Sequence, residues 1–142
     1  MSDPISKTRR LNKRDYESLA NFRYALRGFL AFSETAANAV GLSPQQHQAL
    51  LAIKGSRNRD RLSIGEIGER LGVRHHTAVE LVNRLESRGL IKRKRDANDA
   101  RRVHVHLTHK AGALIETLSH AHIKELQGIR PALERLISGL SG

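Results

Sequence analysis

Basic side chains crowd into one short segment of this chain of 142 residues. Residues 84–102 contain eight Lys or Arg and only three Asp or Glu, a local surplus of five positive charges. The whole chain holds 25 basic and 14 acidic residues, so this segment carries almost half of the net charge of +11. A charge run can be a plain solvated surface, but a surplus this dense favours an anionic partner, with nucleic acid first.

Other kinds of chemistry find no matching residues in the sequence. Cysteine is absent, which excludes a disulfide framework, a zinc ribbon and thiol catalysis. Eight histidines are scattered along the chain, and although His104 and His106 share one side of a predicted strand, no set of three or four ligands converges. Glycine-rich phosphate loops, nucleophile elbows and paired carboxylates are also missing. We therefore predict no metal site and no cofactor, and we do not expect an enzyme.

Helices are predicted over most of the chain, because apolar positions recur at steps of three and four. Ser63 and Glu66 have the spacing of a capping box, which satisfies backbone donors at the start of a helix. Gly72 and Gly89 stand where two helices are expected to end. The predicted helices are a long one over 13–41, one that Ser43-Pro44 begins, a short one from Ser63 to Gly72, one from about His75 to Gly89, and one that Thr108 begins.

A hairpin is predicted between the fourth and fifth of these helices. Residues 90–95 have strand character, residues 96–99 have the composition of a turn, and residues 102–107 alternate polar and apolar side chains. Two short helices joined by a Gly-containing turn and followed by a basic hairpin predict a winged helix-turn-helix, whose second helix enters the major groove of DNA. The predicted fold class is therefore mainly α with a small antiparallel β-hairpin.

The segments that flank this unit are predicted to be long helices with apolar stripes. Neither can bury its stripe alone, so we expect each to pair with the same segments of a second chain; packing within a monomer is the alternative. Gly128 and Pro131 are expected to interrupt the last helix and leave a short one after them. The predicted parts of a single domain over 1–142 are a disordered tail at 1–12, dimerisation helices at 13–41 and 109–142, and a DNA-binding lobe at 42–108.

At the hairpin the sequence resembles the MarR family of bacterial transcriptional regulators. The stretch 95–108, with Gly112 just after it, is similar to the family's wing signature, an Asp-x-Arg followed by an alternating strand that ends in Leu-Thr. Residues 81–91 resemble the end of the family's recognition helix and its first wing strand, and residues 42–46 resemble the entry to its second helix. The resemblance extends over nearly the whole chain and implies a homodimeric winged helix-turn-helix regulator.

The resemblance and the residue types together assign a surface that contacts DNA. The resemblance implies that Arg101 enters the minor groove and that Asp99 orients it, although such a pair can also merely brace a turn. Arg74 stands where the family usually has a small polar N-cap, so it lies either in the helix or in the turn before it. Strand alternation lets only part of the run 92–95 face a duplex. The predicted DNA-binding residues are Arg74, His75, His76, Thr77, Glu80, Arg84, Lys92, Lys94, Arg95, Asp99, Arg101 and Arg102.

An effector pocket is a further implication of the resemblance. Family members often bind small aromatic or phenolic molecules between the dimer base and the DNA-binding lobes. All Phe and Tyr residues of this chain lie in the predicted first helix. Plain core or dimer packing is the alternative role for such residues. The candidate effector-binding residues are Tyr24, Arg27, Phe32 and His47.

The expected function is that of a repressor that binds pseudo-palindromic double-stranded DNA as a homodimer and that a small effector releases from DNA. The half-sites would lie about one helical turn apart, ~34–36 Å. The alternative is a basic RNA- or ribosome-associated protein that uses the same fold without operator specificity. No apolar run approaches the ~20 residues of a membrane span, and the N-terminus lacks a signal-peptide core, so a cytoplasmic protein without a membrane partner is expected.

Overall fold

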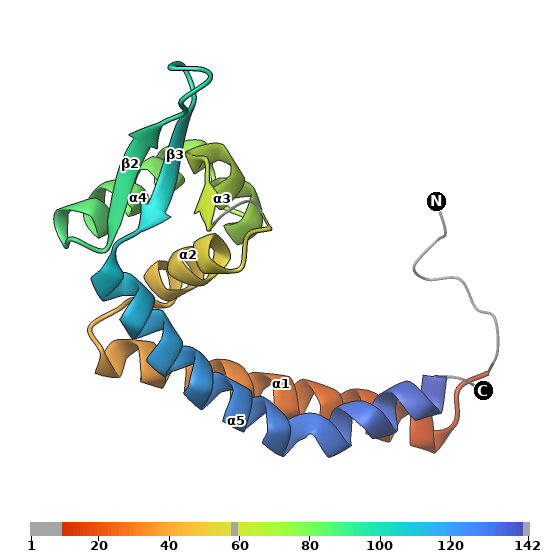
Figure 1. The fold of residues 1–142 in the computed structure, drawn as a ribbon. Helices are drawn as coiled ribbons and strands as arrows, with labels where there is room; N and C mark the ends of the chain where they lie inside the picture. The colour runs from red at the N-terminus through yellow and green to blue at the C-terminus, as the bar shows by residue number, and fades with distance from the viewer. Residues whose placement is uncertain (1–9, 58–59, 141–142) are drawn as a thin grey trace. The chain divides into compact units, whose positions relative to one another are not determined.

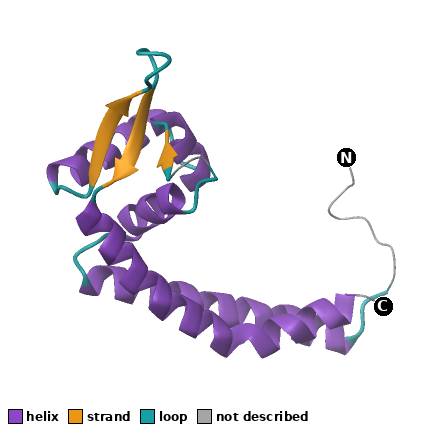
Figure 2. Ribbon diagram, viewed as in Figure 1, coloured by secondary structure: helices purple, strands orange, loops and turns teal. Residues whose placement is uncertain are grey.

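The computed structural model describes residues 10–57 and 60–140, which form five helices and a small sheet (Figure 1; Figure 2). The predicted fold class, mainly α with a small antiparallel β-element, is confirmed. Residues 1–9 of the predicted disordered tail lie outside the described residues. The elements are α1 (Lys13–Ala39), α2 (Pro44–Lys54), β1 (Arg61–Leu62), α3 (Ile64–Leu71), α4 (His75–Ser87), β2 (Ile91–Arg95), β3 (Val103–Leu107) and α5 (His109–Leu140).

The chain divides into two compact units. Residues 33–122 form one, here called the lobe unit, which holds the sheet, helices α2, α3 and α4, and the adjoining ends of α1 and α5. The described residues up to 32 and from 123 onward form the other, here called the helical unit. The predicted DNA-binding lobe falls inside the lobe unit, while the assignment of the whole chain to a single domain stays a prediction.

One apolar core holds the lobe unit together, and capping boxes fix where its helices begin. Ser43 Oγ accepts the N–H of Gln46 at 3.1 Å, and Gln46 Oε1 accepts the N–H of Ser43 at 3.0 Å. Ser63 and Glu66 repeat this exchange at the start of α3, as predicted. Each box satisfies donors that a helix leaves unpaired at its start. The largest fully buried apolar side chains are Leu42, Leu50, Ile53, Ile67, Val82, Leu85, Leu90, Ile91, Val105 and Ile115.

Two glycines allow α3 and α4 to pack closely. Gly72 ends α3 with a φ of 67°, in the left-handed region that glycine enters without strain. A Cβ atom added to Gly68 would lie 3.3 Å from the Cβ of Ala78 in α4. The helix-turn-helix predicted from the sequence is therefore present, and the lack of a side chain at Gly68 lets α4 lie close against α3.

The sheet has three antiparallel strands in the order β1-β3-β2. The sequence predicted only the β2–β3 hairpin. The third strand, β1, has two residues, too few to show an alternating pattern. Leu62, Ile91 and Val105 point into the core, so their neighbours along each strand lie on the opposite side. This opposite side, here called the outer face, carries Arg61, Lys92, Lys94, His104 and His106.

Helix α5 follows β3 after a single residue. Thr108 Oγ1 accepts the N–H of Ala111 at 3.2 Å, which confirms the predicted cap, and donates to the carbonyl of Gly89 at 2.7 Å. The predicted interruption at Gly128 and Pro131 is wrong, because α5 continues through both to Leu140. A proline inside a helix removes one backbone hydrogen bond, and the surrounding turns tolerate that local loss.

The helical unit leaves many apolar side chains on its surface. Apart from Leu51, every described large apolar residue that is more than a third exposed belongs to this unit. No helix in the described part of the chain is long and apolar enough to cross a membrane. The exposed side chains of the unit are Leu11, Tyr16, Leu19, Tyr24, Leu26, Leu30, Ile123, Leu126 and Ile137.

Candidate nucleic-acid interface

Helix α4 buries one side in the core and turns the other outward. Ala78, Leu81, Val82 and Leu85 are buried at steps of three and four. The structure places the predicted DNA-contacting residues of this segment away from that stripe. Arg74, His75, His76, Glu80 and Arg84 are exposed, and Thr77 is half-buried. An α-helix exposed along one side has the width that the major groove admits.

The start of α4 is open, in contrast to the starts of α2 and α3. Arg74 occupies the N-cap with an extended backbone, so it lies in the turn and not in the helix. No side chain of the described residues accepts a hydrogen bond from the first turn of α4 at this cap. The unpaired N–H groups and the positive end of the helix dipole therefore face outward together with the Arg74 guanidinium. Such a helix start binds phosphate oxygens well.

The four basic residues of β2 have unequal roles in the structure. All four are exposed, but strand alternation places Lys92 and Lys94 on the outer face and Arg93 on the side of the core. Arg93 donates a hydrogen bond to Asn83 Oδ1 and lies 3.6 Å from Glu86 Oε1, and both partners belong to α4. Arg93 therefore links the wing to the helix. Strand alternation predicts that the residues of β2 lie on two faces, but it does not predict the contacts of Arg93 with Asn83 and Glu86.

Figure 1 shows the turn that connects β2 to β3. Two carboxylates, those of Asp96 and Asp99, hold this turn. Asp96 Oδ1 accepts the N–H of Asn98 at 2.8 Å, and this hydrogen bond, together with one from His104, lowers the pKa of the Asp96 carboxyl. Asp99 Oδ1 accepts both the backbone N–H of Arg101 at 3.1 Å and its Nε at 3.2 Å. The side chain of Arg101 nevertheless stays 91% exposed. The tip thus presents a cation that is ordered before any partner arrives.

Among the residues of the outer face, only Lys92 and Lys94 belong to the interface predicted from the sequence. His104 Nε2 donates to Asp96 Oδ2 at 3.1 Å. Burial and the neighbouring cations lower the pKa of His106. The alternation of His104 and His106 with Val105 already predicts that the two histidines share one side of β3. Arg61 joins them only through β1, and the sequence gives no signal for that strand. No group of three or more potential metal ligands gathers among the residues that the structure describes.

The four predicted effector-binding residues fall in different units. Tyr24 and Arg27 are exposed and Phe32 is half-buried in the helical unit, whereas His47 is buried in the lobe unit. The ring of His47 lies 4.8 Å from the ring of His122. The Nδ1 atom of His47 is buried and has no hydrogen-bond partner among the described residues. Burial, and then the nearby His122, lower the pKa of His47. An effector role for these four residues stays a prediction.

Comparisons with known proteins agree with this architecture. A family model described as the MarR family matches residues 40–102. The HTH-type transcriptional regulator TtmR of Methylorubrum extorquens is 30% identical over 140 residues, 99% of this chain and 60% of that protein. The uncharacterized HTH-type transcriptional regulator YcgE of Bacillus subtilis is 32% identical over 103 residues, 72% of this chain and 58% of that protein. The chain thus spans less than two thirds of the length of these curated relatives.

A similar fold is found in a mutant of MepR from Staphylococcus aureus, solved bound to an oligodeoxyribonucleotide. The two structures align with a TM-score of 0.66 at 22% sequence identity, over 89% of this chain and 93% of that one. At this level of identity the likeness concerns the fold alone.

Proposed function

We propose that this chain, whose residues 40–102 match a family model described as the MarR family, is a transcriptional regulator that binds double-stranded DNA. The observation that carries the proposal is the joint exposure, in one compact unit, of the open start of α4 and the Arg101 tip of the wing. Helix α4 supplies contacts to base edges in the major groove, and Arg101 supplies a cation for the narrow minor groove.

Contacts to phosphate and contacts to bases have different consequences in this interface. Lys92, Lys94, Arg95 and Arg102 are exposed cations that attract any duplex, and their contribution falls as salt rises. His76, Thr77 and other α4 residues face outward near the start of the helix, where sequence is recognised. The proposed regulator therefore binds DNA generally through the wing and selects a sequence through α4.

A selection of bound sequences from random duplex DNA tests the proposal. The expected result is a pseudo-palindrome whose half-sites lie about one helical turn apart, ~34–36 Å. No enriched sequence, together with comparable affinity for structured RNA, would instead support a basic RNA-associated protein and overturn the proposal. Repression is the proposed outcome at a promoter, and a reporter gene placed behind the selected site measures it.

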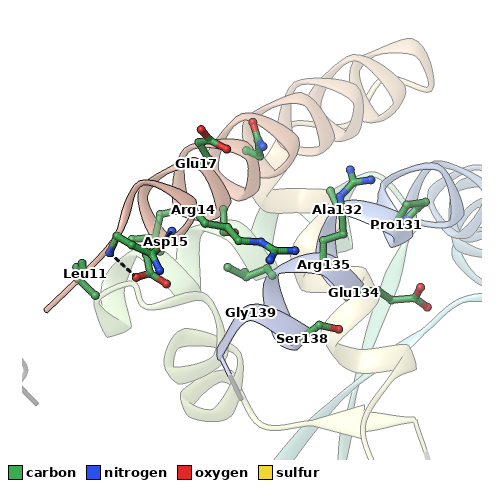
Figure 3. Close-up of a pocket in the computed structure, with 15 residues that line it drawn as sticks. Leu11, Arg14, Asp15, Glu17, Pro131, Ala132, Glu134, Arg135, Ser138 and Gly139 are labelled. Atoms are coloured by element: carbon green, nitrogen blue, oxygen red, sulfur yellow. Dashed lines mark hydrogen bonds between the residues drawn. The ribbon is translucent and has the colours of Figure 1, made fainter. Parts of the chain in front are cut away.

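A homodimer is the proposed form of the regulator, because the helical unit exposes apolar side chains that one chain does not cover. Leu30 is 56% exposed and Ile123 is 54% exposed. Near its described ends the unit also has an open cavity of about 1040 Å³ between the start of α1 and the end of α5 (Figure 3). Exposed apolar side chains that are concentrated in one unit favour an interaction site there. Leu30→Glu is expected to yield monomers in sedimentation, whereas the exposed control Glu34→Gln leaves the dimer intact.

A small aromatic effector is the proposed regulator of DNA binding. Tyr24 and Arg27 offer an exposed ring and an exposed cation, which suit an aromatic carboxylate or a phenol. Phe32 and His47 are the other two proposed contacts. A panel of phenols and aromatic carboxylates, added to the protein on its selected duplex, is expected to contain a compound that releases the DNA. Arg27→Ala should weaken that response, and no release by any compound would contradict the proposal.

A further inference from the structure

The outer face of the sheet presents cations from all three strands in one row. The register pairs Arg61 of β1 with His106 of β3, and His106 with Lys92 of β2. Side chains of residues paired in this way lie on the same face of a sheet as neighbours. Lys94 lies next along β2 on the same face. A row of potential cations without an intervening acid is unfavourable unless an anion compensates it.

The acidic groups near this face gather at its other end, around His104. Asp96 accepts a hydrogen bond from His104, and Glu66 at the start of α3 is close enough for His104 to lower its pKa. Burial is the largest cause that lowers the pKa of His106. The neighbouring Lys94, Arg61 and His104 lower this pKa further. The end of the face at His106 is thus electropositive, whereas the end at His104 is balanced.

Arg61 adds a separate observation: its hydrogen bonding is incomplete, although Asp96 lies near enough for Arg61 to lower the pKa of that carboxyl. Its backbone N–H is held by Ser56 Oγ at 3.1 Å, so its place in the row is fixed. Its Nε atom is buried and has no hydrogen-bond partner among the described residues. A guanidinium N–H without a partner is costly. Because this Nε is itself buried, a phosphate at the row would meet the rest of the Arg61 guanidinium.

The position of the outer face indicates which anion reaches it. Arg93 on the opposite side of β2 contacts α4, so the outer face looks away from that helix. Strand β2 also continues directly into the wing, whose tip carries Arg101. Flanking DNA that extends past the wing tip, on the side away from α4, would meet the outer face.

We propose that the outer face, through Arg61, Lys92 and His106, binds backbone phosphates of the DNA that flanks each half-site. This inference rests on the proposed function and extends it beyond α4 and the wing tip. The occupant is duplex DNA, because the row is continuous with the proposed interface and opposite in charge to the phosphate backbone.

Proton uptake is the distinguishing property of this contact. In the free protein His106 is held toward its neutral form by burial and by Lys94, Arg61 and His104. A phosphate beside the ring reverses that bias and favours the charged form. Binding of flanking DNA therefore takes up a proton at His106, and the affinity gained from the flanks rises as the pH falls.

Two duplexes that share the selected palindrome provide the test with the full chain. One duplex ends at the half-sites, and the other extends each end by about one helical turn, ~10 bp. The longer duplex is expected to bind with a salt dependence steeper by about 0.9 for each added phosphate contact. Its affinity should also rise more on acidification than that of the shorter duplex, and the difference between the two duplexes removes the effect of the histidines in α4.

Variants of His106 separate this inference from its alternatives. His106→Gln should abolish the extra pH dependence on the longer duplex and leave binding to the shorter one unchanged, while His106→Lys should keep the extra affinity without pH dependence. The exposed His109→Gln is the matched control and should behave as the unchanged protein. Equal salt and pH dependence on both duplexes would overturn the inference. Failure to bind either duplex would instead contradict the proposed function.

A free anion is the remaining competitor for the row. Inorganic phosphate is titrated into the protein at constant ionic strength while the imidazole resonance of His106 is followed by NMR. The inference requires the longer duplex to shift that resonance. A shift caused by phosphate and not by the longer duplex would assign the row to a small anion and overturn the DNA contact.

Discussion

Asp99 holds Arg101 through one oxygen atom, which accepts the backbone N–H at 3.1 Å and the side-chain Nε at 3.2 Å. Arg101 is 91% exposed while Asp99 is 34% exposed, so the carboxylate lies against the turn and the guanidinium projects from it. An exposed pair of this kind contributes little to folding stability. Its effect is to reduce the side-chain freedom that Arg101 would otherwise lose on binding.

Replacement of Arg101 tests the role of the wing tip. Arg101→Ala is expected to weaken binding to the selected duplex by about 1–3 kcal/mol, as for other specific contacts. Arg101→Lys should recover only part of the loss, because Lys does not match the planar geometry of Arg. Fluorescence anisotropy with the labelled duplex measures both. Unchanged affinity in Arg101→Ala would show that the tip does not contact DNA.

Replacement of Arg93 tests the link between the wing and α4. Arg93→Ala removes the contacts to Asn83 and Glu86, so the orientation of the wing relative to α4 becomes less restricted. We expect a loss of stability below about 1 kcal/mol, since the ion pair is partly exposed, together with weaker DNA binding. Glu86→Gln breaks the ion pair but keeps the positive charge of Arg93, so it should reproduce part of the weakening of DNA binding. If Arg93→Ala weakens DNA binding and Glu86→Gln does not, the lost charge of Arg93 alone explains the effect.

Replacement of Thr77 tests sequence recognition by α4. Thr77→Ala is expected to change which bases the selection enriches, because lost major-groove contacts discriminate by about 1–3 kcal/mol. Lys94→Ala should instead weaken all duplexes similarly and reduce the salt slope by about 0.9 if it neutralises one phosphate. Parallel selections with the two variants measure the difference. Identical enriched sequences for Thr77→Ala and the unchanged protein would remove this residue from the recognition surface.

The buried His47 predicts a dependence of folding stability on pH. Burial lowers its pKa in the folded chain, so below about pH 6.5 the unfolded chain binds more protons at this site. The free energy of unfolding should therefore decrease as the pH falls through that window, by at most about 1.4 kcal/mol per pH unit for this group. Urea unfolding at several pH values measures the slope.

His47→Leu should make that decrease shallower, since an apolar side chain has no proton to gain. His120→Gln is the matched control, because His120 is exposed on α5. A decrease of the same steepness in His47→Leu would show that other groups, such as His106, determine the acid sensitivity.

The elements with strong local signals were predictable from the sequence. The capping box of Ser63 and Glu66 and the alternation around Val105 located α3 and β3 to within one residue. Both signals arise from neighbouring residues, because a cap spans one turn and a strand repeats every two residues. The resemblance to the family then supplied the pairing of Asp99 with Arg101, which the structure contains.

Features that depend on contacts between distant residues were not predictable. Strand β1 forms because Arg61 and Leu62 pair with β3, and two residues carry no periodicity of their own. The contacts of Arg93 with α4 likewise need the register of the hairpin and the direction of the helix. Pro131 was expected to end a helix, but propensity at a single position is outweighed by the turns around it.

The one-residue connection at Thr108 has a consequence for how the sequence can vary in length. Thr108 is hydrogen-bonded to both Gly89 and Ala111, so the end of β3, the end of the α4 segment and the start of α5 meet at one side chain. Each residue of a helix advances it by about 100°, since a turn takes 3.6 residues. An insertion of one residue here would therefore rotate every buried position of α5 out of the core. The fold should accordingly tolerate insertions and deletions in the wing tip, but not at this junction.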